Sequence, residues 1–305
     1  MTTSVTKASK VFFQEQAIFK RSYWSAGKVF ALLLLAGISV LFIVPLLWMI
    51  STSLKEPSDL MGNNWIPTRL AWENYRDAFS FGMWPRWTMN TVIITLISVV
   101  GQVLSSSLVA YAFARLRWKG RDTVFALVLA TMMLPGVVTM IPQFVVFAKL
   151  PAFGFMGSKV WVNTFLPLTV PAFTGSAFYI FLLRQFMRGI PMDLSDAAKI
   201  DGAGELRIWW SIIMPLCKPA LAAVAIFAFQ GAWQDFMGPL LYLQSEKFYT
   251  LQLGLRQFAA AAGGAPAWHW LMAASLMVML PVLIVFIMFQ RYFMEGITFT
   301  GMTGR

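Results

Sequence analysis

An acidic residue, Asp235, stands alone inside a long apolar stretch of the sequence, with Gln230, Trp233 and Gln234 close by. Carboxamides bond to hydroxyl groups and an indole ring can cover an apolar C–H face, so these side chains are suited to a transient contact with a sugar. The alternative is that Trp233 packs inside a helix bundle while Gln234 and Asp235 bond to a neighbouring helix. The residue types alone leave both interpretations open.

The same stretch carries small residues in a helical register. Gly231, Asp235 and Gly238 follow one another at i, i+4 and i+7, which predicts one shared helix face that another helix can approach closely. A charge at mid-membrane costs about 2.5 to 3.5 kcal/mol on insertion scales, so Asp235 requires protein or water around it. Counting up a continuous helix from Pro219 places this carboxylate toward the far side of the membrane.

A second distinctive stretch, residues 193–219, is polar and begins with a short helix pattern. Asp193 or Ser195 is suited to cap the helix start, and Asp196 adds negative charge to the first turn, where the helix dipole favours it. Gly202 suits a C-terminal turn with positive φ. Such a short helix is unstable alone, so we expect it to pack against another surface.

A second helical run, residues 205–214, follows Gly204, which makes the link between the two helices more flexible. Pro215 and Pro219 are predicted to end this run and lead into the next apolar stretch. Two caps, a glycine hinge and a proline exit favour a helix-turn-helix elbow that docks on a partner. An ordinary solvated loop is the alternative.

These residues must be positioned by membrane-spanning helices. The chain has 305 residues, of which 58% are hydrophobic and only 12% are charged, and a span needs about 20 consecutive apolar residues. We therefore predict an all-α integral membrane protein with six transmembrane helices. The six apolar runs are 29–50, 87–114, 123–148, 160–183, 220–245 and 257–290, the last with its helix proper from about Trp268 and an Ala/Gly-rich loop before it.

Basic residues set the predicted orientation. With the N-terminus in the cytoplasm, the inner segments hold 16 of the 24 Lys and Arg residues, which favours both termini inside. The predicted organisation is an N-terminal segment over 1–28, either an interfacial helix or disordered, a six-helix transmembrane domain over 29–293 with a loop at 191–219, and a tail over 294–305. The net charge of +11 indicates topology and anionic lipid, and we expect no nucleic-acid partner.

The third apolar run contains LPGVVTMIPQ, in which Pro135, Gly136 and Pro142 interrupt helical hydrogen bonding. Broken helices are tolerated in a membrane where they line a cavity or are packed by protein. A bend or gate is therefore predicted here, and Gln143 just beyond it joins Gln230, Trp233, Gln234 and Asp235 as a candidate for the path of a solute.

The sequence lacks the residues that several kinds of site require. One Cys and one His exclude an internal disulfide and Cys/His zinc sites, so we expect no metal on this chain. No phosphate-binding loop motif occurs, and no acid, base and nucleophile set is evident. We therefore predict no catalytic residues and no cofactor here; if ATP is used, another chain binds it.

The polar stretch DAAKIDGAGELRIWWSIIMPLCKP resembles the EAA loop of the membrane subunits of binding-protein-dependent ABC importers, with Asp196 in place of the usual Glu. In that family the loop carries the coupling helix, which sits on the ATP-hydrolysing subunit. The resemblance implies a cytoplasmic coupling loop between helices 4 and 5. It assigns ATPase coupling to Asp196, Ala197, Ala198, Asp201, Gly202, Ala203 and Pro215.

The resemblance extends from about Ser25 to the Gly-rich tail and is to the MalG-type permeases of sugar importers. It implies half of a heterodimeric pore in the bacterial or archaeal cytoplasmic (inner) membrane. The implied partners are a MalF-like permease, two ATPase subunits with ATP and Mg, and an extracytoplasmic solute-binding protein, with a sugar or oligosaccharide as solute. The alternatives are an ion-gradient-driven secondary transporter, a membrane enzyme and a scaffold that only recruits an ATPase.

Overall fold

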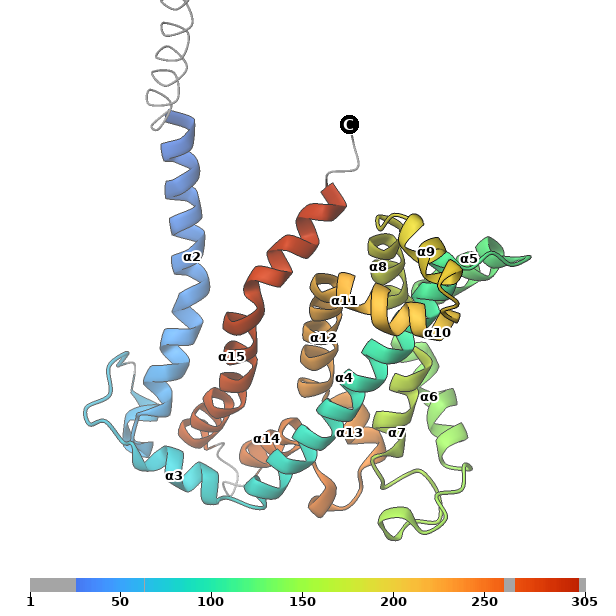
Figure 1. The fold of residues 1–305 in the computed structure, drawn as a ribbon. Helices are drawn as coiled ribbons and strands as arrows, with labels where there is room; N and C mark the ends of the chain where they lie inside the picture. Colours follow the sequence, from blue (N-terminus) through green and yellow to red (C-terminus); the bar gives the residue numbers. More distant parts are fainter. Residues whose placement is uncertain (1–25, 63, 261–266, 302–305) are drawn as a thin grey trace, which may run out of the picture.

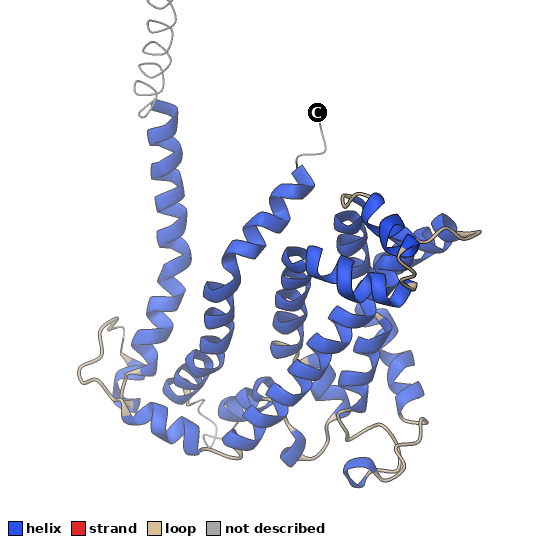
Figure 2. Cartoon of the chain, in the orientation of Figure 1, coloured by secondary structure: helices blue, strands red, loops and turns tan. Residues whose placement is uncertain are grey.

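The computed structural model describes residues 26–62, 64–260 and 267–301 (Figure 1). Within these ranges every regular element is a helix, and one isolated β-bridge joins Pro151 and Val160 (Figure 2). The predicted all-α class is confirmed. The first 25 residues, most of the Ala/Gly-rich stretch 259–266 and the last four residues lie outside the described ranges, so the predictions for them stay predictions.

Helix α2 (Ala26–Ser53) forms one side of the bundle, and α4 (Trp84–Arg115) runs diagonally across its front (Figure 1). The elements of the first half are α2 Ala26–Ser53, η1 Pro57–Met61, α3 Glu73–Ser80, α4 Trp84–Arg115, α5 Arg121–Ala130, η2 Thr131–Met133, α6 Gly136–Phe147 and η3 Phe155–Gly157. Those of the second half are α7 Leu166–Thr169, η4 Val170–Thr174, α8 Ala177–Arg188, α9 Asp193–Ile200, α10 Glu205–Ile208, η5 Trp209–Ile213, α11 Met214–Leu216, α12 Lys218–Trp233, α13 Met237–Tyr242, η6 Glu246–Phe248, α14 Leu251–Ala260 and α15 Trp268–Gly301.

Four stretches of the described residues are long and apolar enough to cross a membrane, and up to six spans result if each of two bent helix pairs counts as one. The predicted runs fall on α2, α4, α5 with α6, α7 with α8, α12, and α15. The last span begins at Trp268 as predicted. The bundle has two ends in Figure 1, called here the α9 end and, opposite it, the α3 end.

Two spans are interrupted where the chain cannot continue a helix. The helices before and after Pro135 are bent by 99°, because proline lacks a backbone N–H and restricts the residue before it. The break predicted in the third run is therefore confirmed. The fourth run, predicted as one helix from residue 160, starts only at Leu166 and is broken at Gly175, whose φ is +80°.

Packing is concentrated around α4. One apolar core joins α4 to α8 and to the α9–α11 segment (residues 193–216), with Leu183, Met187, Ile208 and Ile213 fully buried. A second core at the α3 end surrounds Trp87, which donates its indole N–H to the carbonyl of Glu246 at 3.0 Å. By contrast, the apolar window of α2 buries no residue within the chain.

Candidate functional site

Helix α9 begins at Asp193, directly after Pro191 and Met192. Asp193 and Asp196 lie in its first turn, where the helix dipole favours negative charge. The predicted side-chain cap is wrong. Asp193 is the first residue of the helix, so the cap position falls on Met192, which makes no capping hydrogen bond. Ser195 faces the protein interior, where its hydroxyl has no partner among the described residues.

The end of α9 follows the prediction. Gly202 has a φ of +79°, a conformation that glycine adopts without steric cost. Its N–H bonds to the carbonyl of Lys199 at 3.0 Å, and the N–H of Ala203 bonds to the carbonyl of Ala198 at 2.9 Å. This pair of bonds is a Schellman motif, which satisfies the last carbonyls of the helix. Three of the predicted coupling residues therefore build one rigid turn.

The two faces of α9 differ in burial. Ser195 and Ala198 are buried and pack on the core around α4 and α8, so this helix is held by packing as expected. The other predicted residues of α9 and its turn, Asp196, Ala197 and Asp201, are exposed. Exposed apolar side chains accompany them on the same segment: Leu194, Ile200, Leu206 and Trp210. Ile200 is 87% exposed, so the end of α9 presents a large apolar side chain outward.

Two side chains one turn apart on α4, Tyr111 and Arg115, form hydrogen bonds to residues in and just before the α9–α11 segment. The hydroxyl of Tyr111 donates to Glu205 Oε2 at 2.5 Å, and Arg115 Nη1 donates to the carbonyl of Pro191 at 3.3 Å. Glu205 also pairs with Lys199 of α9 at 2.8 Å. The Lys199 ammonium and then the Tyr111 hydroxyl hold the pKa of the Glu205 carboxyl below its ordinary value of 4.5. Helices α4, α9 and α10 are thus joined through one carboxylate.

The exit from the segment is a sharp bend. The helical run through α10, η5 and α11 meets α12 at 86°, with Cys217 between them at φ −90° and ψ 7°. Pro219 lies in the first turn of α12, as predicted. Pro215 does not end the run: it is exposed in the first turn of α11, which continues to Leu216. The rigid turn, its α4 anchors and this bend connect α9 mechanically to two spans.

The fifth span is shorter than predicted. Helix α12 ends at Trp233 and α13 begins only at Met237, so the face predicted to unite Gly231, Asp235 and Gly238 in one helix is wrong. Pro239 lies in the first turn of α13, and because proline has no N–H to bond to the carbonyl of residue 235, a continuous helix is disfavoured here. In addition, Asp235 Oδ1 accepts the backbone N–H of Gly238 at 3.0 Å, a side-chain bond of the kind that competes with helix continuation.

The residues predicted to line the solute path differ in their exposure and in their contacts. Trp233 is 4% exposed and donates its indole N–H to the carbonyl of Val278 at 3.0 Å, which favours the packing interpretation for this ring. Asp235 is half-buried, whereas Gln230 and Gln234 are exposed at the end of α12. These two carboxamides are one helical turn apart and therefore share a face.

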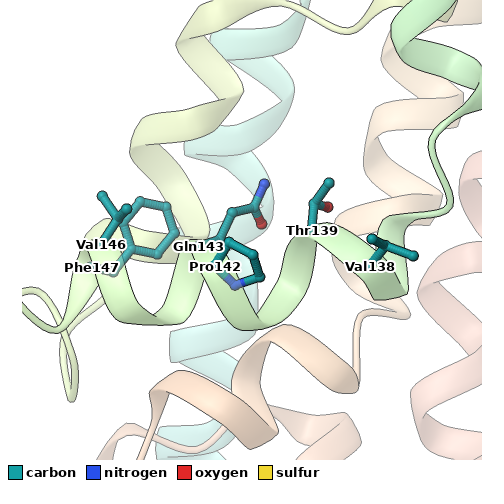
Figure 3. Close-up of a pocket in the computed structure, with 6 residues that line it drawn as sticks. All are labelled: Val138, Thr139, Pro142, Gln143, Val146 and Phe147. Carbon is teal, nitrogen blue, oxygen red and sulfur yellow. The ribbon is translucent and has the colours of Figure 1, made fainter.

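Gln143 lies on α6, where it lines a shallow hollow of about 450 Å³. Figure 3 shows Gln143 and Thr139 rising from the same side of this helix. The hollow is otherwise lined by Val138, Pro142, Val146 and Phe147. Phe144 and Phe147 lie against Tyr242 of α13, with ring centroids 6.1 and 5.5 Å apart, so α6 and α13 are neighbours. No hydrogen bond joins Gln143 to Gln230 or Gln234 in the described part of the chain.

Several features of the site were missed from the sequence. The contact between Tyr111 and Glu205 joins residues 94 positions apart, and no local pattern signals it. The exposure of Ile200 could have been anticipated, because it follows the exposed Asp196 at i+4 and therefore shares its helix face. The role of Asp235 in ending α12 depends on the backbone of Gly238, which only the fold reveals.

Together, these features define a multi-pass membrane protein whose spans carry a short, exposed helix at one end. The chain belongs to the family described as binding-protein-dependent transport system inner membrane component, whose model matches residues 102–298. The predicted resemblance to this family is thereby confirmed. The roles of the individual residues within it stay predictions.

Relatives extend the match over most of the chain. It is 36% identical over 274 residues to the arabinooligosaccharides transport system permease protein AraQ of Halalkalibacterium halodurans, covering 88% of this chain and 94% of that protein. It is 30% identical to the trehalose/maltose transport system permease protein MalG of Thermococcus litoralis, covering 87% and 93%. A crystal structure of a bacterial ABC transporter involved in the import of alginate matches with a TM-score of 0.76 at 22% identity, over 89% of this chain and 99% of that one. That likeness shows the fold.

Proposed function

We propose that this chain is the membrane-spanning subunit of an ATP-driven importer, and that α9 is the element through which a separate ATPase drives it. The observation that carries this proposal is the projecting helix itself: α9 is ended by a rigid turn, is joined to α4 through Glu205, and leaves the side chains of Leu194 and Ile200 exposed. ATP and its Mg²⁺ bind on the partner ATPases, while this chain holds no cofactor and performs no covalent chemistry.

The anchors explain how a push on α9 reaches the membrane. Movement of the docked ATPases displaces α9, and the contacts through Glu205 transmit this displacement to α4 and α10. The 86° bend at Cys217 then turns motion of the α9–α11 segment into rotation of α12. Such rigid-body rocking alternates access to a path between two membrane subunits. A second, similar permease forms the other half of that path.

The solute that we propose is a sugar or oligosaccharide. The relatives named above are transport permeases for arabinooligosaccharides and for trehalose and maltose, and the family name specifies a binding protein that delivers the solute. The exposed carboxamides of Gln230 and Gln234 and, on α6, Gln143 are suited to bond to hydroxyl groups along the path. Trp233 and Asp235 support these residues from inside the bundle.

The proposed topology places the α9 end in the cytoplasm, with both chain termini on the same side and the α3 end facing the binding protein. Its support is the distribution of the Lys and Arg residues, of which the majority fall in the segments assigned to the inside. The rival of an ion-gradient-driven carrier would use Asp235 as its membrane carboxylate. Here that carboxylate bonds to the backbone of α13, which disfavours such a role.

The docking proposal is tested by co-purification of the tagged chain from its native membranes in gentle detergent. Wild type is expected to bring down an ATP-binding subunit and a second permease. Ile200→Asp places a charge in the apolar contact and is expected to lose the ATPase while keeping the permease. The matched control is Ile66→Asp at the α3 end, where the wild-type side chain is 82% exposed; it should retain both. Retention of the ATPase by Ile200→Asp would overturn the proposed docking surface.

The path is tested separately by uptake measurements in cells. Gln230→Ala and Gln234→Ala are expected to reduce sugar uptake while leaving the ATPase bound, because neither residue lies in the α9–α11 segment. Gln244→Ala is the control, since Gln244 is exposed beyond the end of α13. Unchanged uptake in both path variants would remove these carboxamides from the proposed path.

A further inference from the structure

A separate hollow lies at the α3 end, away from α9 and from the proposed path. Its volume is about 320 Å³. It forms where the end of α2, the turn η1 and the loop after it meet the first residue of α15, helices that lie side by side at the lower left of Figure 1. The residues that line it include Trp48, Thr52, Lys55, Asn64, Trp65 and Trp268.

Two polar side chains of this hollow have no partner among the described residues. Lys55 is 5% exposed as a whole residue, and its ammonium, which is not itself fully buried, forms no ion pair with any described residue. Thr52 is 2% exposed, and its hydroxyl has no hydrogen bond among the described residues. Burying a hydroxyl without compensation is unfavourable, and no described residue supplies that compensation.

The neighbouring carboxylates are occupied elsewhere. Asp59 accepts the backbone N–H of Thr68 at 3.0 Å and its hydroxyl at 2.7 Å. Glu56 pairs with Arg69 at 2.9 Å. Asp59 acts on Lys55 only at a distance, and the ammonium has room for an anion from outside the chain.

The position of the hollow indicates where that anion comes from. Helix α2 has 28 residues, about 42 Å at 1.5 Å per residue, which exceeds the hydrocarbon thickness of about 30 Å. Its end therefore lies at the level of the lipid headgroups. Trp48, Trp65 and Trp268 are all partly exposed here, and tryptophan is enriched at this level of the membrane. The exposed apolar surface of α2 continues from the hollow into the lipid region.

We propose that this hollow binds the phosphodiester headgroup of a phospholipid in the leaflet at the α3 end. The Lys55 ammonium pairs with the phosphate, and Thr52 and Asn64 donate hydrogen bonds to phosphate or glycerol oxygens. The indole rings border the glycerol region, and an acyl chain lies along α2. The bound lipid thereby ties α2 to α15 at a place where the described residues leave the Thr52 hydroxyl without a partner. The site does not depend on which face of the membrane is the cytoplasmic one.

The test uses the full chain in the assembly with which it purifies. Native mass spectrometry counts retained phospholipid, and thermal melting is followed during titration with short-chain phosphatidylglycerol, with short-chain phosphatidylcholine and with inorganic phosphate. Wild type is expected to retain phospholipid and to melt several degrees higher with either lipid, more so with phosphatidylglycerol. Lys55→Gln and Thr52→Val are expected to weaken the apparent affinity by about tenfold or more, because each removes one donor to the phosphate.

Two further variants complete the test. Lys149→Gln removes an exposed lysine at the α3 end that does not line the hollow, and it should behave as wild type. Trp65→Ala changes a side chain that is 58% exposed, so it keeps the fold and should still weaken lipid retention. Equal retention and equal melting shifts in wild type, Lys55→Gln and Trp65→Ala would overturn the proposal. A melting shift caused by inorganic phosphate and by neither lipid would overturn the assignment to a lipid.

Discussion

The short helices α9 and α13 are stabilised in opposite ways. Helix α9 carries its own stop signal, a glycine at φ +79° with two backbone hydrogen bonds, and leaves most of its surface exposed. Helix α13 has no such signal and is fixed by distant parts of the chain: Tyr242 lies against Phe144 and Phe147 of α6, and its carbonyl accepts the N–H of Asn163 at 2.7 Å. The difference separates a helix that is available to a partner from one that is committed to its own fold.

Substitution of Gly202 tests the first half of this comparison and has the largest expected effect. A β-branched residue at positive φ is strained by about 1 to 3 kcal/mol, so Gly202→Val should unwind the turn, release the ATPase and abolish uptake. Gly202→Asn is the matched control, because asparagine tolerates this conformation and an added Cβ meets nothing within 4 Å. Equal loss of ATPase in both variants would show that the conformation of the turn is not what matters.

The second half of the comparison is tested at Gly238. A Cβ added there would lie 2.4 Å from Asp235 Oδ2 and 2.8 Å from Leu168 Cδ2, so Gly238→Ala should destabilise the purified protein by about 1 to 3 kcal/mol through overpacking. Gly231→Ala provides the control, since its added Cβ meets nothing within 4 Å. Thermal melting should separate the two variants. Similar melting would show that the Asp235 and Leu168 side chains move aside without cost, so that Gly238 is not tightly packed.

Removing the hydroxyl of Tyr111 is expected to have a smaller effect. Tyr111→Phe loses the hydrogen bond to Glu205, which contributes about 1 kcal/mol because that carboxylate is partly exposed to water. ATPase should still co-purify, while uptake per ATP hydrolysed should fall, since α9 is less firmly joined to α4. Tyr179→Phe is the control, as the Tyr179 hydroxyl has no hydrogen bond in the described part of the chain. An unchanged ratio in Tyr111→Phe would remove this contact from the coupling route.

The pH dependence of the same contact is the smallest expected effect. The pKa of the Glu205 carboxyl lies below its ordinary value of 4.5 because of Lys199 and Tyr111. Its contribution, less than about 1 kcal/mol for a partly exposed ion pair, is therefore fully present above pH 4.5 and is lost as the pH falls through the lowered pKa. The difference in melting temperature between wild type and Glu205→Gln should be constant from pH 8 to pH 5 and disappear in stronger acid. A change between pH 8 and pH 6 would indicate another titrating group.

The same contrast explains which features could be predicted from the sequence. The turn at Gly202 and the bend at Pro135 were predicted correctly, because both depend on the backbone restrictions of a single residue. The break before α13 was not predicted, although Pro239 marks it in the sequence; the carboxylate bond and the packing by α6 and α7 that fix it appear only in the fold. The cap predicted at Ser195 failed because the helix begins two residues earlier, at Asp193, so that Ser195 lies inside it. Local signals predict helix ends, and long-range contacts override them.

The apolar window of α2 buries nothing within its own chain, and this has a consequence for biogenesis. Because that window stays exposed although α2 lies beside α15, lipid covers most of its apolar surface, so α2 can insert as an independent step before the remaining spans associate. Its exact side chains then matter less than its length and hydropathy. Replacing apolar residues of α2 by other apolar residues should leave membrane insertion unchanged, whereas shortening the apolar helix to well below about 20 residues should prevent it from spanning the membrane.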